Sequence, residues 1–98
     1  MSPELEAAAH LFGLLSHPMR LRIVVLLSET SPLAAGTLQE LLGVERTALS
    51  HQLRLLREAR LVRVEQRGRR RLYRLADHHV AHIVGDTLAH VAEDHGCT

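Results

Sequence analysis

The chain has 98 residues, 46% of them hydrophobic, and only Phe12 and Tyr73 are aromatic. This length suits one domain, residues 1–98, which buries a modest share of its surface alone and would gain stability from a second subunit. No run of about 18 uncharged apolar residues and no basic leader occurs, which predicts a cytoplasmic protein without a membrane span. The single cysteine, Cys97, excludes a disulfide framework and a CxxC metal site.

The net charge of +1 is unevenly distributed along the chain. Residues 1–53 carry a net charge of −2, residues 54–74 carry +7 with nine arginines, and residues 75–98 carry −4 with no arginine. This segregation predicts two binding functions, for a polyanion in the middle of the chain and for a cation at its histidine-rich end.

The first half of the chain is predicted to be helical. Pro3 begins a helix whose apolar residues recur at helical spacing to about Ser16. The His17-Pro18 step interrupts that pattern, and Pro18 then opens a largely apolar second helix over 19–28, which we expect to be central. Residues 29–36 are predicted to form a loop.

Two further helices follow in close succession. Thr37 is the predicted cap of a short helix over 38–42, which ends at Gly43. A second amphipathic helix is predicted over 45–60, directly after this glycine turn. Two helices joined in this way form a helix-turn-helix.

A hairpin and a last helix complete the chain. Residues 61–66 and 71–75 alternate apolar and polar side chains around a basic turn over 67–70, which predicts a two-stranded antiparallel hairpin. Asp77 is the predicted cap of a final helix to about residue 94. The order ααααββα describes a mainly α (α+β) winged helix-turn-helix, with its first and last helices as the expected dimer contact.

The basic middle of the chain predicts a DNA-binding surface. A helix fits the major groove, where residues near its start reach base edges while arginines bind phosphates. The alternative is that the charge run is only a solvated surface and that His51 is structural. The candidates for reading bases are Thr47, Ser50, His51 and Gln52, those for flanking phosphates are Arg46, Arg54 and Arg57, and those at the hairpin tip are Arg67, Arg69, Arg70 and Arg71.

Five of the eight histidines fall in the predicted last helix and its end. At about 100° per residue, His79, Asp86, His90 and Glu93 share one stripe beside the apolar stripe, with His82 at its edge. A rise of about 1.5 Å per residue nevertheless separates His79 from His90 by roughly 16 Å, whereas metal–ligand bonds are about 2 Å. One chain cannot bring both residues to one ion.

Two antiparallel copies of the helix remove this difficulty. A two-fold axis places Asp77 and His79 of one copy beside His90 and Glu93 of the other, which predicts two equivalent metal sites per homodimer. The apolar stripe beside these residues would form the dimer contact. The alternative is that the histidines are ordinary surface or interface residues.

These stretches resemble the ArsR/SmtB family of metal-responsive winged-helix repressors over nearly the whole chain. The sequence SHPMRLRI at 16–23 resembles the family's entry into its second helix, and TALSHQLRLLREARLV at 47–62 its recognition helix and first wing strand. The last helix resembles the pattern D-x-H-x10-H-x2-(E/H). The resemblance implies that Thr47, Ser50 and His51 face DNA and that Asp77, His79, His90 and Glu93 form a metal site across the dimer interface.

The resemblance also implies a response to zinc, nickel or cobalt, with release of operator DNA on metal binding. Four nitrogen and oxygen ligands suit tetrahedral zinc, but further donors would suit six-coordinate nickel or cobalt, which we prefer slightly. The helix over 38–42 has no cysteine, so arsenic, cadmium and lead are not expected. The candidates for additional ligands are His82, Asp86, His78, His95 and His10.

Two other functions fit the sequence less well. One is a metal-independent regulator of the same fold, which would bind its operator equally with and without metal. The other is a small metal-binding carrier protein, which specific operator binding would exclude. No nucleophile–base pair or phosphate-binding glycine loop occurs, so we expect neither an enzyme nor an organic cofactor.

Overall fold

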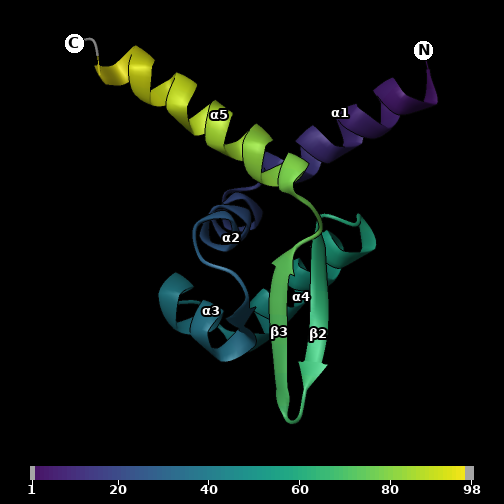
Figure 1. Ribbon diagram of the computed structural model, residues 1–98, viewed down its shortest axis with the longest axis vertical. Helices are drawn as coiled ribbons and strands as arrows, with labels where there is room; N and C mark the ends of the chain where they lie inside the picture. The colour runs from purple at the N-terminus through teal and green to yellow at the C-terminus, as the bar shows by residue number, and fades with distance from the viewer. Residues whose placement is uncertain (1, 97–98) are drawn as a thin grey trace.

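The computed structural model describes residues 2–96, with side chains as far as residue 93. The order of its helices and the hairpin confirms the winged helix-turn-helix prediction. Figure 1 shows α1 and α5 extending to opposite sides of a body formed by the other elements, with the hairpin at the far end. The elements are α1 (Pro3–Leu15), α2 (Pro18–Glu29), β1 (Leu33–Ala34), α3 (Ala35–Leu42), α4 (Arg46–Glu58), β2 (Val62–Arg67), β3 (Arg70–Leu75) and α5 (His78–Gly96).

The ends of the first helices follow from local capping. The Ser2 hydroxyl accepts a hydrogen bond from the Leu5 amide at the start of α1. His17 caps α2, where its Nδ1 accepts from the Met19 amide at 3.2 Å. Gly43 ends α3 in the left-handed conformation, with φ of 65°, as the sequence predicts.

The segment before α3 differs from the sequence prediction. The predicted loop over 29–36 contains β1, and α3 begins at Ala35 rather than after Thr37. Ala34 is the N-cap residue of α3, and no side chain caps this helix end. A two-residue strand is too short to show alternation, so only its tertiary pairing defines it.

The sheet consequently has three strands in the order β1-β3-β2, instead of the predicted two. Leu33 and Ala34 of β1 pair with Tyr73 and Leu72 of β3. The hairpin of β2 and β3 is one residue longer on each strand than predicted at its tip, because Arg67 pairs with Arg70. Gly68 occupies the first position of the resulting two-residue turn with φ of 61°, as in type II′ hairpins.

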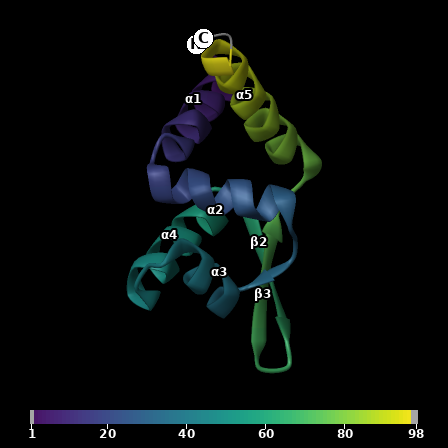
Figure 2. The ribbon, with the colours of Figure 1, turned by 90° about the vertical axis from the view of Figure 1, so that its left-hand side faces the viewer.

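Helix α2 lies at the centre of the hydrophobic core, as its apolar sequence predicts. Figure 2 shows it between α1 and α5 above and α3, α4 and the sheet below. Among the α5 side chains that the structure describes, as far as residue 93, those buried are Val80 and Val84 of the first two turns. The core consists of Leu15, Ile23, Val24, Leu27, Leu33, Leu38, Leu42, Leu49, Leu53, Leu56, Leu61, Val62, Tyr73, Val80 and Val84.

None of the helices within residues 2–96 is by itself both long enough and apolar enough to cross a membrane. Among the described helices, α1 and α2 together are long and apolar enough, but the chain bends by 96° between them.

The end of α4 holds a non-glycine residue in a left-handed conformation. Arg60 has φ of 61°, the Arg60 amide donates to the Arg57 carbonyl, and the Leu61 amide donates to the Leu56 carbonyl at 2.9 Å. This is a Schellman-type helix end, in which glycine is the favoured residue. The turn directs the chain from α4 into β2.

We predict that Arg60→Gly stabilises the protein. A left-handed conformation costs a non-glycine residue about 1–2 kcal/mol, which the substitution would remove. Glycine also has greater freedom in the unfolded chain, which lowers stability by roughly 0.5–1 kcal/mol and offsets part of this effect. Urea unfolding should therefore show a net increase of up to about 1 kcal/mol. Arg57→Gly, inside the last turn of α4, is the control and should lower stability by about 1 kcal/mol.

Candidate DNA-binding face and metal centre

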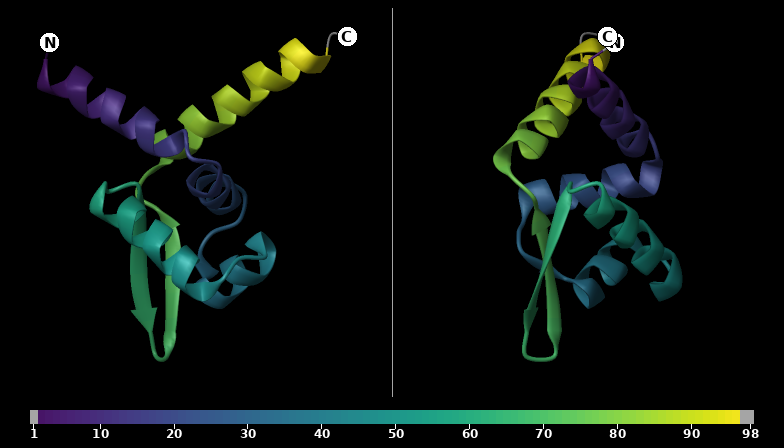
Figure 3. Two further views of the ribbon diagram at one scale, coloured as in Figure 1. Left: turned by 180° about the vertical axis from the view of Figure 1, so that it is seen from behind. Right: turned by 90° about the vertical axis from the view of Figure 1, so that its right-hand side faces the viewer.

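Helix α4 presents one apolar side to the core and one polar side to solvent. Leu49, Leu53 and Leu56 are buried, whereas the predicted base-reading residues Thr47, Ser50 and His51 are exposed. The predicted phosphate contacts Arg46, Arg54 and Arg57 are exposed too. Figure 3 shows α4 and the hairpin at the same end of the molecule, away from both termini.

Gln52 lies differently from the other predicted base-reading residues. It is half-buried, and its Oε1 accepts a hydrogen bond from Arg20 Nη1 at 2.9 Å. The Arg20 Nε also donates to the Leu14 carbonyl at 2.8 Å. Arg20 of α2 therefore connects the end of α1 to α4, and this contact gives Gln52 a positioning role within the fold.

Arginines of the hairpin tip and of α4 surround a shared hollow. Arg69, Arg70 and Arg71 line it together with Arg46 and the first residues of α3. The helix end here has no side-chain cap, so its amides add to the positive potential. The hollow combines the charge and the donors that bind a phosphate group.

Arg67 has a different environment from the other tip arginines. Its Nε lies 2.9 Å from Glu65 Oε1, and Arg74 Nη2 lies 3.4 Å from the other oxygen of the same carboxylate. Both contacts are largely solvent-exposed and contribute little to stability. The contact with Glu65 partly neutralises Arg67, whereas no ion pair is described for Arg69 or Arg70.

The structure adds Arg63 to the basic surface. This β2 residue is exposed and lines a shallow hollow with Arg54 and Arg57 of α4. Sequence analysis placed Arg63 in the basic segment but not among the DNA contacts. Its alternation with buried Val62 predicts exposure, whereas its position beside α4 depends on the tertiary fold.

The structure separates the predicted metal ligands within one chain. Helix α5 is continuous, so Asp77 and His79 lie at its start, and His90 lies roughly 16 Å from His79 along the axis, with Glu93 further still. Within the described residues, no three or more His, Cys, Asp or Glu side chains come together as a potential metal site. One subunit alone therefore does not form the predicted centre.

Asp77 also has a structural role at the start of α5. Its Oδ1 accepts hydrogen bonds from the amides of His79 at 2.9 Å and Val80 at 3.2 Å, which confirms the predicted cap. The second carboxylate oxygen has no such bond among those described. The capping contact holds Asp77 beside His79, both of them exposed.

The candidates for additional ligands lie in several places. His78 and His82 are exposed near the start of α5, Asp86 is exposed one turn later, and His10 is exposed on α1. The side chain of His95 lies outside the described residues. The rings of His78 and His79 are 4.1 Å apart between centroids.

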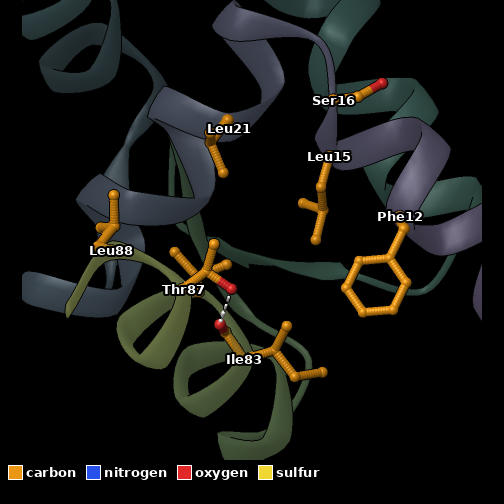
Figure 4. Close-up of a pocket in the computed structure, with 8 residues that line it drawn as sticks. Phe12, Leu15, Ser16, Leu21, Ile83, Thr87 and Leu88 are labelled. Atoms are coloured by element: carbon orange, nitrogen blue, oxygen red, sulfur yellow. Dashed lines mark hydrogen bonds between the residues drawn. The ribbon is translucent and has the colours of Figure 1, made fainter. Parts of the chain in front are cut away.

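A partly exposed apolar surface runs along α1 and α5. Leu88 and Val91 continue the stripe of Val80 and Val84 but are 44% exposed, and Phe12 of α1 is 55% exposed. Figure 4 shows Phe12, Ile83 and Leu88 around the pocket between these helices and α2. Contiguous exposed apolar surface is typical of interaction sites, so these residues are candidates for a contact with another molecule.

A helix-turn-helix followed by a β-hairpin defines the class of winged helix-turn-helix DNA-binding domains. A family model described as "Helix-turn-helix domain" matches residues 15–65. The chain is 44% identical over 90 residues to the HTH-type transcriptional repressor SmtB of Mycobacterium tuberculosis, covering 92% of this chain and 66% of that repressor. It thus spans just under two thirds of that relative's length.

Two solved structures share the fold over most of the chain. One is the homodimeric winged helix-turn-helix domain of a possible ArsR-family regulator from Mycobacterium bovis, with 27% identity and a TM-score of 0.82 over 97% of this chain and 90% of that one. The other is the antimony-specific repressor AntR, with 27% identity and a TM-score of 0.87 over 98% of this chain and 86% of that one. The chain belongs to the ArsR/SmtB family of transcription regulators, which are not enzymes.

Removing the tip arginines should weaken DNA binding without changing sequence preference. Each phosphate that the protein no longer neutralises reduces the slope of log affinity against log salt by about 0.9. We predict that Arg69→Ala/Arg70→Ala lowers affinity for specific and nonspecific duplexes alike, and reduces the slope by about 1–2, in anisotropy titrations from about 50 to 200 mM salt. Arg22→Ala, an exposed arginine of α2, is the control; an equal loss of affinity there would argue against a role for the tip.

Proposed function

We propose that the protein is a homodimeric DNA-binding repressor whose operator affinity changes when a divalent metal ion binds between the two α5 helices. The observation that carries this proposal is the division of the donor set into two halves. Asp77 and His79 lie at one end of a single rigid helix, and His90 and Glu93 lie at the other. A second antiparallel helix would complete both halves at once.

The proposed dimer rests on the apolar surface of α5. The stripe that is buried at Val80 and Val84 continues at Leu88 and Val91, which no element in the described part of the chain covers fully. The homodimeric relative from Mycobacterium bovis supports the same assembly. A two-fold contact would cover this stripe in both copies and place the neighbouring polar stripes at its margins.

The donor chemistry favours a borderline or hard divalent ion. Imidazole and carboxylate ligands suit Zn²⁺, Ni²⁺ and Co²⁺, whereas soft ions prefer thiolates. AntR is described as antimony-specific, but the present chain has one cysteine, Cys97. We prefer nickel or cobalt, with zinc second, because further histidines are available to complete six ligands.

A backbone hydrogen bond connects the start of α5, where Asp77 and His79 lie, to the residue that follows the end of α4. The Ala76 amide, next to Asp77, donates to the Leu61 carbonyl at 2.9 Å, and Leu61 closely follows the end of α4. A metal ion that shifts the start of α5 would displace this junction. The change in operator affinity can be no larger than the metal's preference for one of the two states, typically about 1–3 kcal/mol.

Repression by the apo dimer is the proposed direction of control. Two recognition helices one DNA turn apart would read a palindromic operator, and metal binding would move them from that spacing. By thermodynamic reciprocity, operator DNA would weaken metal binding by the same factor. A metal-independent regulator would instead show one operator affinity under all conditions.

Disrupting the exposed apolar stripe should prevent dimerisation. A charge at Leu88 would be buried without a partner in the proposed contact. We predict that Leu88→Glu sediments as a monomer at protein concentrations of about 10 μM, at which the unchanged chain is a dimer. Ala89→Glu places the same charge on the other side of α5 and is the control. Equal sedimentation of the two variants would contradict this contact.

Metal ligands should be separable from DNA contacts by mutation. We predict that a metal ion changes operator affinity by about tenfold, and that His79→Ala or Glu93→Ala abolishes this change while apo affinity stays within about twofold. Fluorescence anisotropy with Zn²⁺, Ni²⁺ and Co²⁺ at fixed salt measures both quantities.

The control for Glu93→Ala is Glu29→Ala, an exposed glutamate at the end of α2, which should keep the full metal response. If none of the three ions alters the affinity of the unchanged chain, the metal-independent regulator is the better description.

A further inference from the structure

We propose that His78 and His82 form a second metal site within each chain, which binds a divalent ion such as Ni²⁺. The residues are one helical turn apart, at positions i and i+4 of α5. This is the spacing at which two histidines on one helix face bind a single metal ion. Both side chains are exposed, and their ring centroids lie 5.6 Å apart at an interplanar angle of 69°.

The observed ring separation is close to that of a chelate. Imidazole nitrogens bind zinc at about 2.1 Å, which holds two ring centres roughly 4.5–5.5 Å apart on one ion. The His78 and His82 ring centroids, 5.6 Å apart, lie just above this range. Because both side chains are exposed, a small change of side-chain torsion angle brings them into range.

The pair lies at the edge of the proposed intersubunit stripe, with His82 next to it and His78 further away. At about 100° per residue, its centre is about 80° from His79 and about 120° from the apolar stripe of Val84 and Leu88. In the proposed dimer the apolar stripe is covered, while His78 and His82 stay open to solvent. The accessibility of the pair in the dimer therefore rests on the proposed function, whereas the ability of the two imidazoles to bind metal does not.

Two protein ligands define the expected strength of this site. No third donor joins the pair within the described residues, so water completes the coordination. Such a site binds more weakly than one with four protein ligands, and imidazole ligands favour nickel over cobalt. Since the His78 ring lies 4.1 Å from that of His79, an ion captured here is next to a ligand of the proposed intersubunit site.

The test uses the full chain with His79→Ala/His90→Ala, which removes the intersubunit donors. Isothermal titration with Ni²⁺ should detect one ion per chain, bound about tenfold or more weakly than the first ion of the unchanged protein. Adding His78→Ala, His82→Ala or both should weaken this binding equally, by about tenfold or more, because a chelate needs both rings. Circular dichroism confirms that each variant is folded.

Three results would overturn the proposal. The first is the absence of Ni²⁺ binding in the His79→Ala/His90→Ala chain, and the second is binding that survives His78→Ala. The third is an equal loss of binding on Asp86→Ala, which would show that Asp86, one turn further along α5, is the partner of His82. The proposed function is tested separately, because it predicts the operator response of the unchanged chain. If metal does not change operator affinity but Ni²⁺ still binds at His78 and His82, the proposed function is rejected and the second metal site is not.

Discussion

The geometry of α5 is the constraint on which the rest of the proposed mechanism depends. An uninterrupted helix of 19 residues cannot fold back on itself, so donors eleven residues apart remain roughly 16 Å apart. The same continuity places half of its apolar stripe beyond the core. The antiparallel pairing of two copies would both bring the two halves of the metal-ligand set together and cover the exposed apolar surface.

The arrangement of the other elements explains how such pairing could affect DNA. Helix α2 packs at the centre, and Arg20 on it contacts both the end of α1 and Gln52 of α4. At the other side, Ala76 links the start of α5 to Leu61 after α4. Helix α4 is therefore connected by hydrogen bonds to both helices of the proposed dimer contact, which is the route by which the proposed pairing would reach it.

Sequence periodicity was sufficient to predict the helices and the hairpin, because each has a strong local pattern or cap. It failed at β1, whose two residues are defined only by pairing with β3. It also grouped Gln52 with the exposed residues of α4, although this side chain contacts Arg20. The exposure of Arg63 could be predicted from strand alternation, but its closeness to Arg54 and Arg57 required the packing of β2 beside α4.

Local patterns in the sequence are enough to define the order of elements, the basic centre, and a helix face bearing imidazoles and carboxylates. These features arise from spacing along the chain, which needs no knowledge of distant contacts. The folded structure was needed to establish which arginines share a hollow, which polar residue of α4 turns inward, and where α5 leaves the core. Those properties depend on residues far apart in the chain, whose relative positions are determined by packing around α2.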